Sequence, residues 1–170
     1  GNAGLEAMLE NVQGTHNLVH HAQQNCHFIF ASSIVVYGDY HCYNFLEDMQ
    51  PKPTSLYALS KYNAENIINR YERIGKIKKT NLRLCALVGK GLTHGFIFDL
   101  INKIKSDSPE LELIGAAPGS IKPFLNIEDA CNTVLHAIQK KMYGTYNVCP
   151  RDNISVEQVA KMAMKTLNIH

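Results

Sequence analysis

The sequence has no hydrophobic run long enough to cross a membrane and no strong excess of charge of either sign. Its longest apolar stretches, 28–33 and 82–88, fall far short of the ~18 residues that a membrane-spanning helix needs. A net charge of +2 is too small to indicate binding to nucleic acid. With 45% hydrophobic and 19% charged residues among 170, the composition is that of one globular domain with a substantial core. We therefore expect a protein that binds neither membranes nor nucleic acid.

Paired cysteines are also lacking. The five cysteines are odd in number and none belongs to a Cys-x-x-Cys pair, so neither a disulfide framework nor a zinc knuckle is indicated. No signal peptide is recognisable. These features predict reduced thiols and a cytoplasmic location. The chain begins Gly-Asn-Ala-Gly rather than with Met, which indicates a processed or cut product.

Helical and strand patterns alternate along the chain. Helices are predicted at 5–24, 55–73, 93–105, 128–140 and 155–167, and strands at 27–32, 80–86, 111–115 and 144–149. Thr54 or Ser55 is expected to cap the second helix, and Ser155 the last one. Such alternation predicts an α/β fold with a parallel sheet covered on both faces. The long strands are too few for a complete doubly wound domain, so we predict a partial one.

The stretch "SSIVVYGDYHCYNFLEDMQPKPTSLYALSK" at 32–61 carries a candidate catalytic constellation. Serines follow an apolar strand, at the end where open α/β sheets bind ligands. Tyr57 and Lys61 are four residues apart, so they share one face of a helix. An ammonium near a phenol is expected to lower the pKa of the phenol, which can then take a proton from a substrate hydroxyl. A Tyr-x-x-x-Lys pair alone is a weak signal, because amphipathic helices often carry a surface Tyr and Lys.

Together with its neighbours this stretch resembles the extended short-chain dehydrogenase/reductases, especially nucleotide-sugar epimerases such as UDP-glucose 4-epimerase. The resemblance rests first on "FIFASSIVVYGD" and "YALSK". It extends over nearly the whole chain through "ENVQGTHNLVHHA", "NLRLCALVGKG", "IKPFLNIEDA" and "GTYNVCPRDNISVEQVA". The resemblance implies a truncated NAD-dependent domain. Its Rossmann-like half would comprise 1–90 and 127–150, and its substrate-side lobe about 91–126 and 150–170.

The resemblance also implies the roles of single residues. Ser33 would orient the sugar oxygen, Tyr57 would be the acid/base, and Lys61 would lower the pKa of Tyr57 and hold the nicotinamide ribose of NAD. Ser32 and Asn11 would line the cofactor pocket. Family members that eliminate water carry acidic residues after the catalytic hydroxyl, whereas Ile34 and Val35 cannot titrate here. Reversible hydride transfer at a sugar hydroxyl is therefore expected.

Three departures from the family pattern concern the ligands. Ala86 replaces an Asn that helps to hold the nucleotide-sugar, and Lys122 replaces an Arg that grips the substrate diphosphate. Lysine can pair with phosphate but lacks the bidentate fork of arginine, and a solvated loop lysine is an equal alternative. No Gly-x-x-Gly-x-x-Gly turn, whose amides would hold the cofactor pyrophosphate, occurs in the chain. The 170 residues alone are therefore expected neither to bind NAD tightly nor to turn over substrate.

Two further interpretations stay open. The chain could belong to a sugar reductase or dehydrogenase of the same family, or to a catalytically silent module that dimerises through the helices at 5–24 and 55–73. The family resemblance implies a homodimer through these same helices. His16 and His20 are four apart, a spacing that can bind zinc, but no third ligand is apparent and polar interface histidines are favoured.

Overall fold

The computed structural model describes residues 2–39, 45–106 and 118–168. The elements in chain order are α1 (Asn2–His21), β1 (Cys26–Ser33), the 3-10 helix η1 (Ile34–Tyr37), α2 (Leu56–Arg73), β2 (Ile77–Leu84), β3 (Ala86–Val88), α3 (Phe96–Lys105), β4 (Ile121–Lys122), β5 (Phe124–Asn126), α4 (Ile127–Gln139), β6 (Gly144–Val148), β7 (Ile154–Ser155) and α5 (Val156–Leu167). The chain divides into two compact units, one of residues 1–85 and 130–148, the other of residues 86–129 and 149–170.

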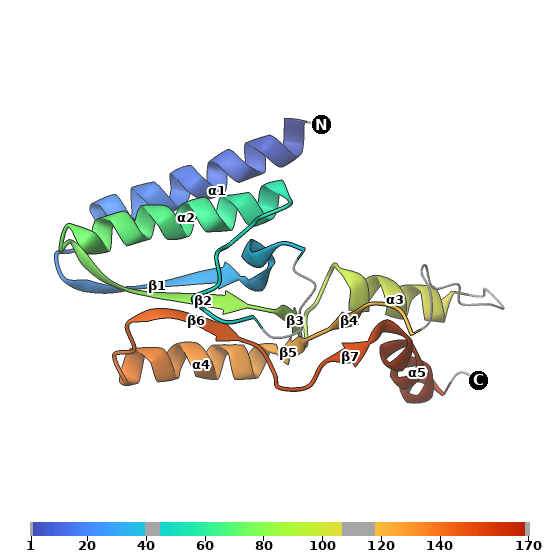
Figure 1. The fold of residues 1–170 in the computed structure, drawn as a ribbon. Helices are drawn as coiled ribbons and strands as arrows, with labels where there is room; N and C mark the ends of the chain where they lie inside the picture. The colour runs from blue at the N-terminus through green and yellow to red at the C-terminus, as the bar shows by residue number, and fades with distance from the viewer. Residues whose placement is uncertain (1, 40–44, 107–117, 169–170) are drawn as a thin grey trace. The chain divides into compact units, whose positions relative to one another are not determined.

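The first unit is a parallel sheet between helices. Its strand order is β1-β2-β6, and β1 pairs along its whole length with β2, from Cys26 opposite Ile77 to Ser33 opposite Leu84. Helices α1 and α2 lie on one face of the sheet and α4 on the other (Figure 1). This arrangement confirms the predicted α/β fold with a parallel sheet.

The core of the first unit joins α1, α2 and the sheet. Val19, Ile68 and Ile77 are almost fully buried and pack together, with Phe28 and Phe30 of β1 against them. Burying side chains of this size stabilises the fold by roughly 1.5–3 kcal/mol each. The hydrophobic side chains of β1 that precede its two serines therefore hold this strand under α2.

The second unit contains two short strand pairs and two helices. β3 pairs in parallel with β5, and β4 pairs antiparallel with β7. Leu100, Ile104 and Ala160 form the buried cluster between α3 and α5. The predicted cap of the last helix is confirmed, because Ser155 and Gln158 form a reciprocal capping box at the start of α5.

Several predicted element boundaries were wrong, among them those of the first helix, which was expected at 5–24 and spans Asn2–His21. The strand expected at 80–86 is two strands, β2, which ends at Leu84, and β3. The N–H of Cys85, between them, donates to the Val148 carbonyl. β2 pairs with β6, whereas β3 pairs with β5. The helix expected from Thr93 begins at Phe96, because Gly95 has a φ of 89°, outside the helical region. The strand expected at 111–115 lies outside the described residues.

None of the helices in the described part of the chain combines the length and the hydrophobicity of a membrane span. Within the same ranges, Cys26, Cys85, Cys131 and Cys149 form no disulfide.

Candidate active site

Ser33 ends β1 and begins η1. Its backbone is extended (φ −145°, ψ 147°), and its Oγ accepts a hydrogen bond of 3.4 Å from the Val35 N–H. This cap turns the chain immediately after the strand. Gly38 ends η1 at a φ of 71°, where a Cβ would lie only 1.9 Å from the Lys52 carbonyl oxygen, so no other residue fits. The Ser33 hydroxyl is therefore presented at the carboxyl end of a parallel strand.

Tyr57 and Lys61 lie on the first two turns of α2. The Ser55 hydroxyl caps this helix by accepting from the Ala58 N–H at 3.1 Å, which confirms Ser55 rather than Thr54 as the cap. Lys61 Nζ donates to the Ala31 carbonyl of β1 at 2.9 Å and lies 5.8 Å from the centroid of the Tyr57 ring. The lysine thus ties α2 to the strand that carries Ser33.

The three predicted catalytic side chains come together. The Tyr57 ring is 53% exposed, and its hydroxyl interacts with the Ser33 side chain through a hydrogen bond. Lys61 reaches β1 beside the same ring. The structure therefore brings a serine, a tyrosine and a lysine to the carboxyl end of β1.

The pKa of Tyr57 moves in the direction opposite to the one expected from the sequence. Partial burial raises the pKa of the Tyr57 phenol, and the Ser33 hydrogen bond lowers it by less than this. Burial also lowers the pKa of Lys61, because it disfavours the ammonium. The Lys61 ammonium, 5.8 Å from the centroid of the Tyr57 ring, does not reverse the effect of burial on the pKa of Tyr57.

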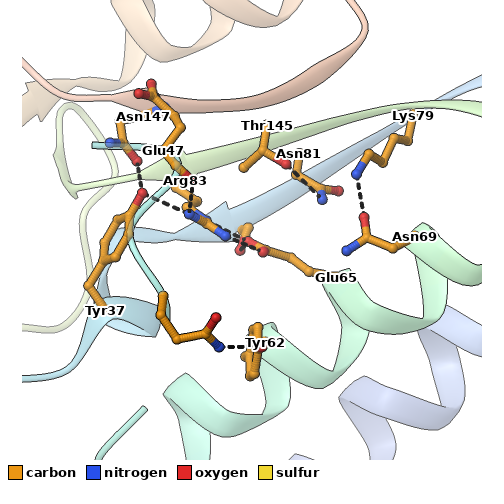
Figure 2. Close-up of polar contacts among 12 residues, drawn as sticks. Tyr37, Glu47, Tyr62, Glu65, Asn69, Lys79, Asn81, Arg83, Thr145 and Asn147 are labelled. Atoms are coloured by element: carbon orange, nitrogen blue, oxygen red, sulfur yellow. Dashed lines mark hydrogen bonds and ion pairs between the residues drawn. The ribbon is translucent and has the colours of Figure 1, made fainter. Parts of the chain in front are cut away.

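Ser32 points into a buried polar network rather than to solvent (Figure 2 shows the surrounding residues). Its hydroxyl donates to Glu65 Oε1 at 2.5 Å. Arg83 of β2 donates to both oxygens of the same carboxylate, from Nε at 3.0 Å and from Nη2 at 2.7 Å. The carboxylate therefore joins β1, β2 and α2 at one buried point.

Arg83 extends this network toward η1. Its Nη1 donates to the Tyr37 hydroxyl at 2.7 Å, and that hydroxyl donates to Asn147 Oδ1 of β6 at 2.8 Å (Figure 2). Burial disfavours the charged guanidinium, but the hydrogen bonds and attraction of Glu65, followed by those of Tyr37, outweigh it and raise the pKa of Arg83. Arg83 is therefore a permanent cation inside the first unit.

The sequence interpretation missed Glu65 and Arg83. A charged residue within the apolar strand "TNLRLCALVG" was a usable signal, because a buried arginine requires a partner. Glu65 also follows Lys61 by four residues and Tyr57 by eight, which places it on the same face of α2.

The remaining predicted site residues lie in different places. Asn11 of α1 donates to Ser60 Oγ at 3.3 Å, and Ser60 donates to the Tyr57 carbonyl at 2.8 Å, so Asn11 supports the backbone of the Tyr57 turn. Lys122 is exposed on β4 of the second unit, with its Nζ 5.9 Å from the centroid of the Phe96 ring. The cofactor contacts of Ser32 and Asn11 and the phosphate contact of Lys122 stay predictions.

Comparison with known proteins bears on what this site does. The model of the NAD dependent epimerase/dehydratase family matches residues 2–149. GDP-6-deoxy-D-talose 4-dehydrogenase of Aggregatibacter actinomycetemcomitans is 26% identical over 133 residues, which make up 77% of this chain and 44% of that protein.

Solved structures give a similar result. A UDP-galactose 4-epimerase has 29% identity and a TM-score of 0.84 over 95% of this chain and 55% of its own. UDP-glucuronic acid 4-epimerase from Bacillus cereus in complex with NAD, at 22% identity, has the same fold with a TM-score of 0.88 over 100% of this chain and 56% of its own. The chain thus spans about half the length of the relatives that it matches.

The buried ion pair of Arg83 and Glu65 is expected to contribute strongly to the stability of the fold. Replacing Arg83 by Met leaves the Glu65 carboxylate buried without its cation, so the free energy of unfolding should fall by about 3–5 kcal/mol. Urea denaturation followed by circular dichroism measures this change. The matched control is Lys161→Met, which breaks the exposed pair with Glu157 and should cost less than about 0.5 kcal/mol. Equal, small effects of both substitutions would contradict the assigned role of the pair.

The hydrogen bond from Ser33 is expected to influence the titration of Tyr57. Because this bond lowers the pKa of Tyr57, Ser33→Ala should raise that pKa further above its ordinary value. An NMR titration of ring-labelled tyrosine, with Tyr57→Phe identifying the resonance, measures the shift. Ser32→Ala is the control and should leave the pKa of Tyr57 unchanged, since the Ser32 hydroxyl donates to Glu65. An unchanged or lowered pKa in Ser33→Ala would refute the contact.

Proposed function

Because the chain belongs to the NAD dependent epimerase/dehydratase family, we propose that the protein is an NAD-dependent nucleotide-sugar epimerase similar to UDP-glucose 4-epimerase. The reaction is a reversible hydride transfer at a sugar hydroxyl. The observation that carries this proposal is the meeting of Ser33, Tyr57 and Lys61 at the carboxyl end of β1.

The residues present fit the nicotinamide end of NAD. Tyr57 is half exposed, and the Lys61 ammonium donates only one of its three N–H groups, to the Ala31 carbonyl. Both side chains therefore retain hydrogen-bond donors for a ribose. When bound, oxidised NAD supplies the hydride acceptor for the sugar carbon. These 170 residues contain no glycine-rich turn whose backbone amides could hold the pyrophosphate of NAD.

Tyr57 transfers the proton of the reacting sugar hydroxyl, and the Ser33 hydroxyl bonds the same oxygen and fixes its position. With its pKa raised by burial, Tyr57 carries its proton at neutral pH in this chain and is ready to act as the acid. Action as the base requires further positive charge near the phenol, beyond what Lys61 supplies. Ile34 and Val35, which follow Ser33, cannot titrate, so a second proton transfer for elimination has no group at these positions.

The substrate is a nucleotide-diphosphate sugar. We assign Lys122 to its diphosphate, as a point charge without the fork of arginine. UDP sugars are the first choice, since the similar solved proteins include a UDP-galactose 4-epimerase and a UDP-N-acetylglucosamine 4-epimerase. Ser32 and Asn11 are assigned to the cofactor side of the pocket, where each would act through the residue that it already bonds.

A dehydrogenase is the second candidate. The similarity to GDP-6-deoxy-D-talose 4-dehydrogenase favours it, and it would use the same three residues. Net reduction of NAD during turnover separates the two, because an epimerase returns the hydride to its product. A silent dimerising module would give neither an epimeric product nor reduced cofactor.

Replacement of the acid/base residue tests the proposal. In the full-length protein with NAD, Tyr57→Phe should lower kcat by about 10²–10⁴-fold on UDP-glucose, UDP-galactose or their N-acetyl forms. Tyr62→Phe is the matched control on the same helix, since the Tyr62 hydroxyl accepts a hydrogen bond from Gln50, and it should retain activity. Near-full activity of Tyr57→Phe would show that the assigned chemistry is wrong.

We further propose a homodimer formed through α1 and α2. Support comes from exposed hydrophobic side chains on both helices and at the end of α2, namely Leu5, Leu9, Leu18, Leu56 and the C-cap Ile74. Covering such side chains drives association across a two-fold axis. Sedimentation at tens of micromolar should give twice the mass of one chain, and Leu9→Glu should shift the equilibrium to the monomer. A wild-type monomer at that concentration would rule this interface out.

A further inference from the structure

Three side chains of α1 and α2 direct nitrogen and oxygen donors at one another. His16 Nε2 lies 3.2 Å and His20 Nδ1 lies 2.9 Å from the hydroxyl oxygen of Tyr71. The two imidazole rings stack with centroids 5.6 Å apart. The phenol has one proton and can donate to only one ring nitrogen, so the other nitrogen must donate to the phenol oxygen. Two imidazoles on one helix thus converge on a phenol of the next.

These separations match those between ligands of a transition-metal ion. Metal–nitrogen and metal–oxygen bonds of about 2.0–2.2 Å in a tetrahedral site place neighbouring donor atoms about 3.3 Å apart. The two His–Tyr distances of 2.9 and 3.2 Å are close to that value. An ion bound by all three groups would replace the protons that the phenol shares with the two imidazoles, and the Tyr71 hydroxyl, on which both nitrogens now converge, would move to make room for it.

We propose that His16, His20 and Tyr71 bind a divalent transition-metal ion of the class that prefers imidazole, such as zinc or copper. The phenol proton leaves to solvent, both imidazoles bind through a lone pair, and water occupies the remaining position. In the described ranges no group of three His, Cys, Asp or Glu is placed to hold a metal, so the proposed site depends on the phenol of Tyr71 as its third ligand.

The site joins α1 to α2 and lies apart from the catalytic residues. Tyr71 follows Tyr57 by fourteen residues on the same helix, which is about 21 Å along the axis. A bound ion would link α1 to α2 at the end of α2 that is distant from Tyr57. The proposal is independent of the epimerase reaction and concerns stability.

His21 provides a matched control. It is exposed, and its ring centroid is 4.9 Å from that of His20, but its Nδ1 is bonded to the Asn17 carbonyl at 2.9 Å. It therefore resembles the proposed ligands in type and position without pointing at Tyr71.

The test is a titration of the full-length protein, free of any histidine tag, with zinc chloride by calorimetry. We expect one ion per chain. Loss of a direct ligand in His16→Ala or His20→Ala should weaken the affinity by at least the roughly tenfold that loss of an outer partner costs. His21→Ala should bind like the wild type. Absence of saturable binding, or equal weakening by His21→Ala, would overturn the site.

Copper(II) tests the third ligand separately. The wild type should show a phenolate-to-copper charge-transfer absorption in the visible range, and Tyr71→Phe should lose it. Zinc affinity unchanged in Tyr71→Phe together with no such absorption would reduce the site to a surface histidine pair and overturn the proposal. If either histidine variant fails to fold, the copper spectra of the wild type and Tyr71→Phe decide the question.

Discussion

The buried pair of Glu65 and Arg83 connects the elements on which the site depends. The carboxylate of α2 accepts from Ser32 of β1 and from Arg83 of β2, and Arg83 in turn donates to Tyr37 of η1. Taking either charge out of water alone costs several kcal/mol, which only the complete set of contacts offsets. The relative positions of α2 and β1 are therefore constrained, and with them the distance from Tyr57 and Lys61 to Ser33.

The pair belongs to a longer polar seam between α2 and the central strand. Alternate residues of β2 face the helix. Lys79 Nζ donates a hydrogen bond to Asn69 Oδ1 and lies 3.5 Å from Glu72 Oε2. Asn69 and Glu72 lie one and two helical turns after Glu65 on α2. Apolar packing alone would tolerate sliding of a helix along a sheet, whereas paired charges at two heights do not. We infer that this seam sets the register of the helix, while the apolar cluster of Val19, Ile68 and Ile77 contributes stabilising burial between the helices and the sheet.

Local spacing in the sequence was sufficient to predict much of this arrangement. The four-residue interval between Tyr57 and Lys61, the apolar strand before Ser33 and the caps at Ser55 and Ser155 depend on neighbours in the chain. The pairing of Glu65 with Arg83, the change of partner after Cys85 and the short strand pairs of the second unit depend on residues far apart in sequence, which spacing does not encode. The direction of the Tyr57 pKa was missed for the same reason, since it follows from burial and not from the lysine four residues away.

We propose that the site formed by Ser33, Tyr57 and Lys61 carries out a hydride transfer that is reversed within one catalytic cycle. The most direct test uses the full-length protein with NAD and UDP-galactose that carries deuterium at C4 of the sugar, or the UDP sugar that it accepts. We expect the epimeric product to retain the deuterium at C4 and none to pass to cofactor in solution. Deuterium in free reduced cofactor, together with a keto-sugar product, would contradict the account and identify a dehydrogenase.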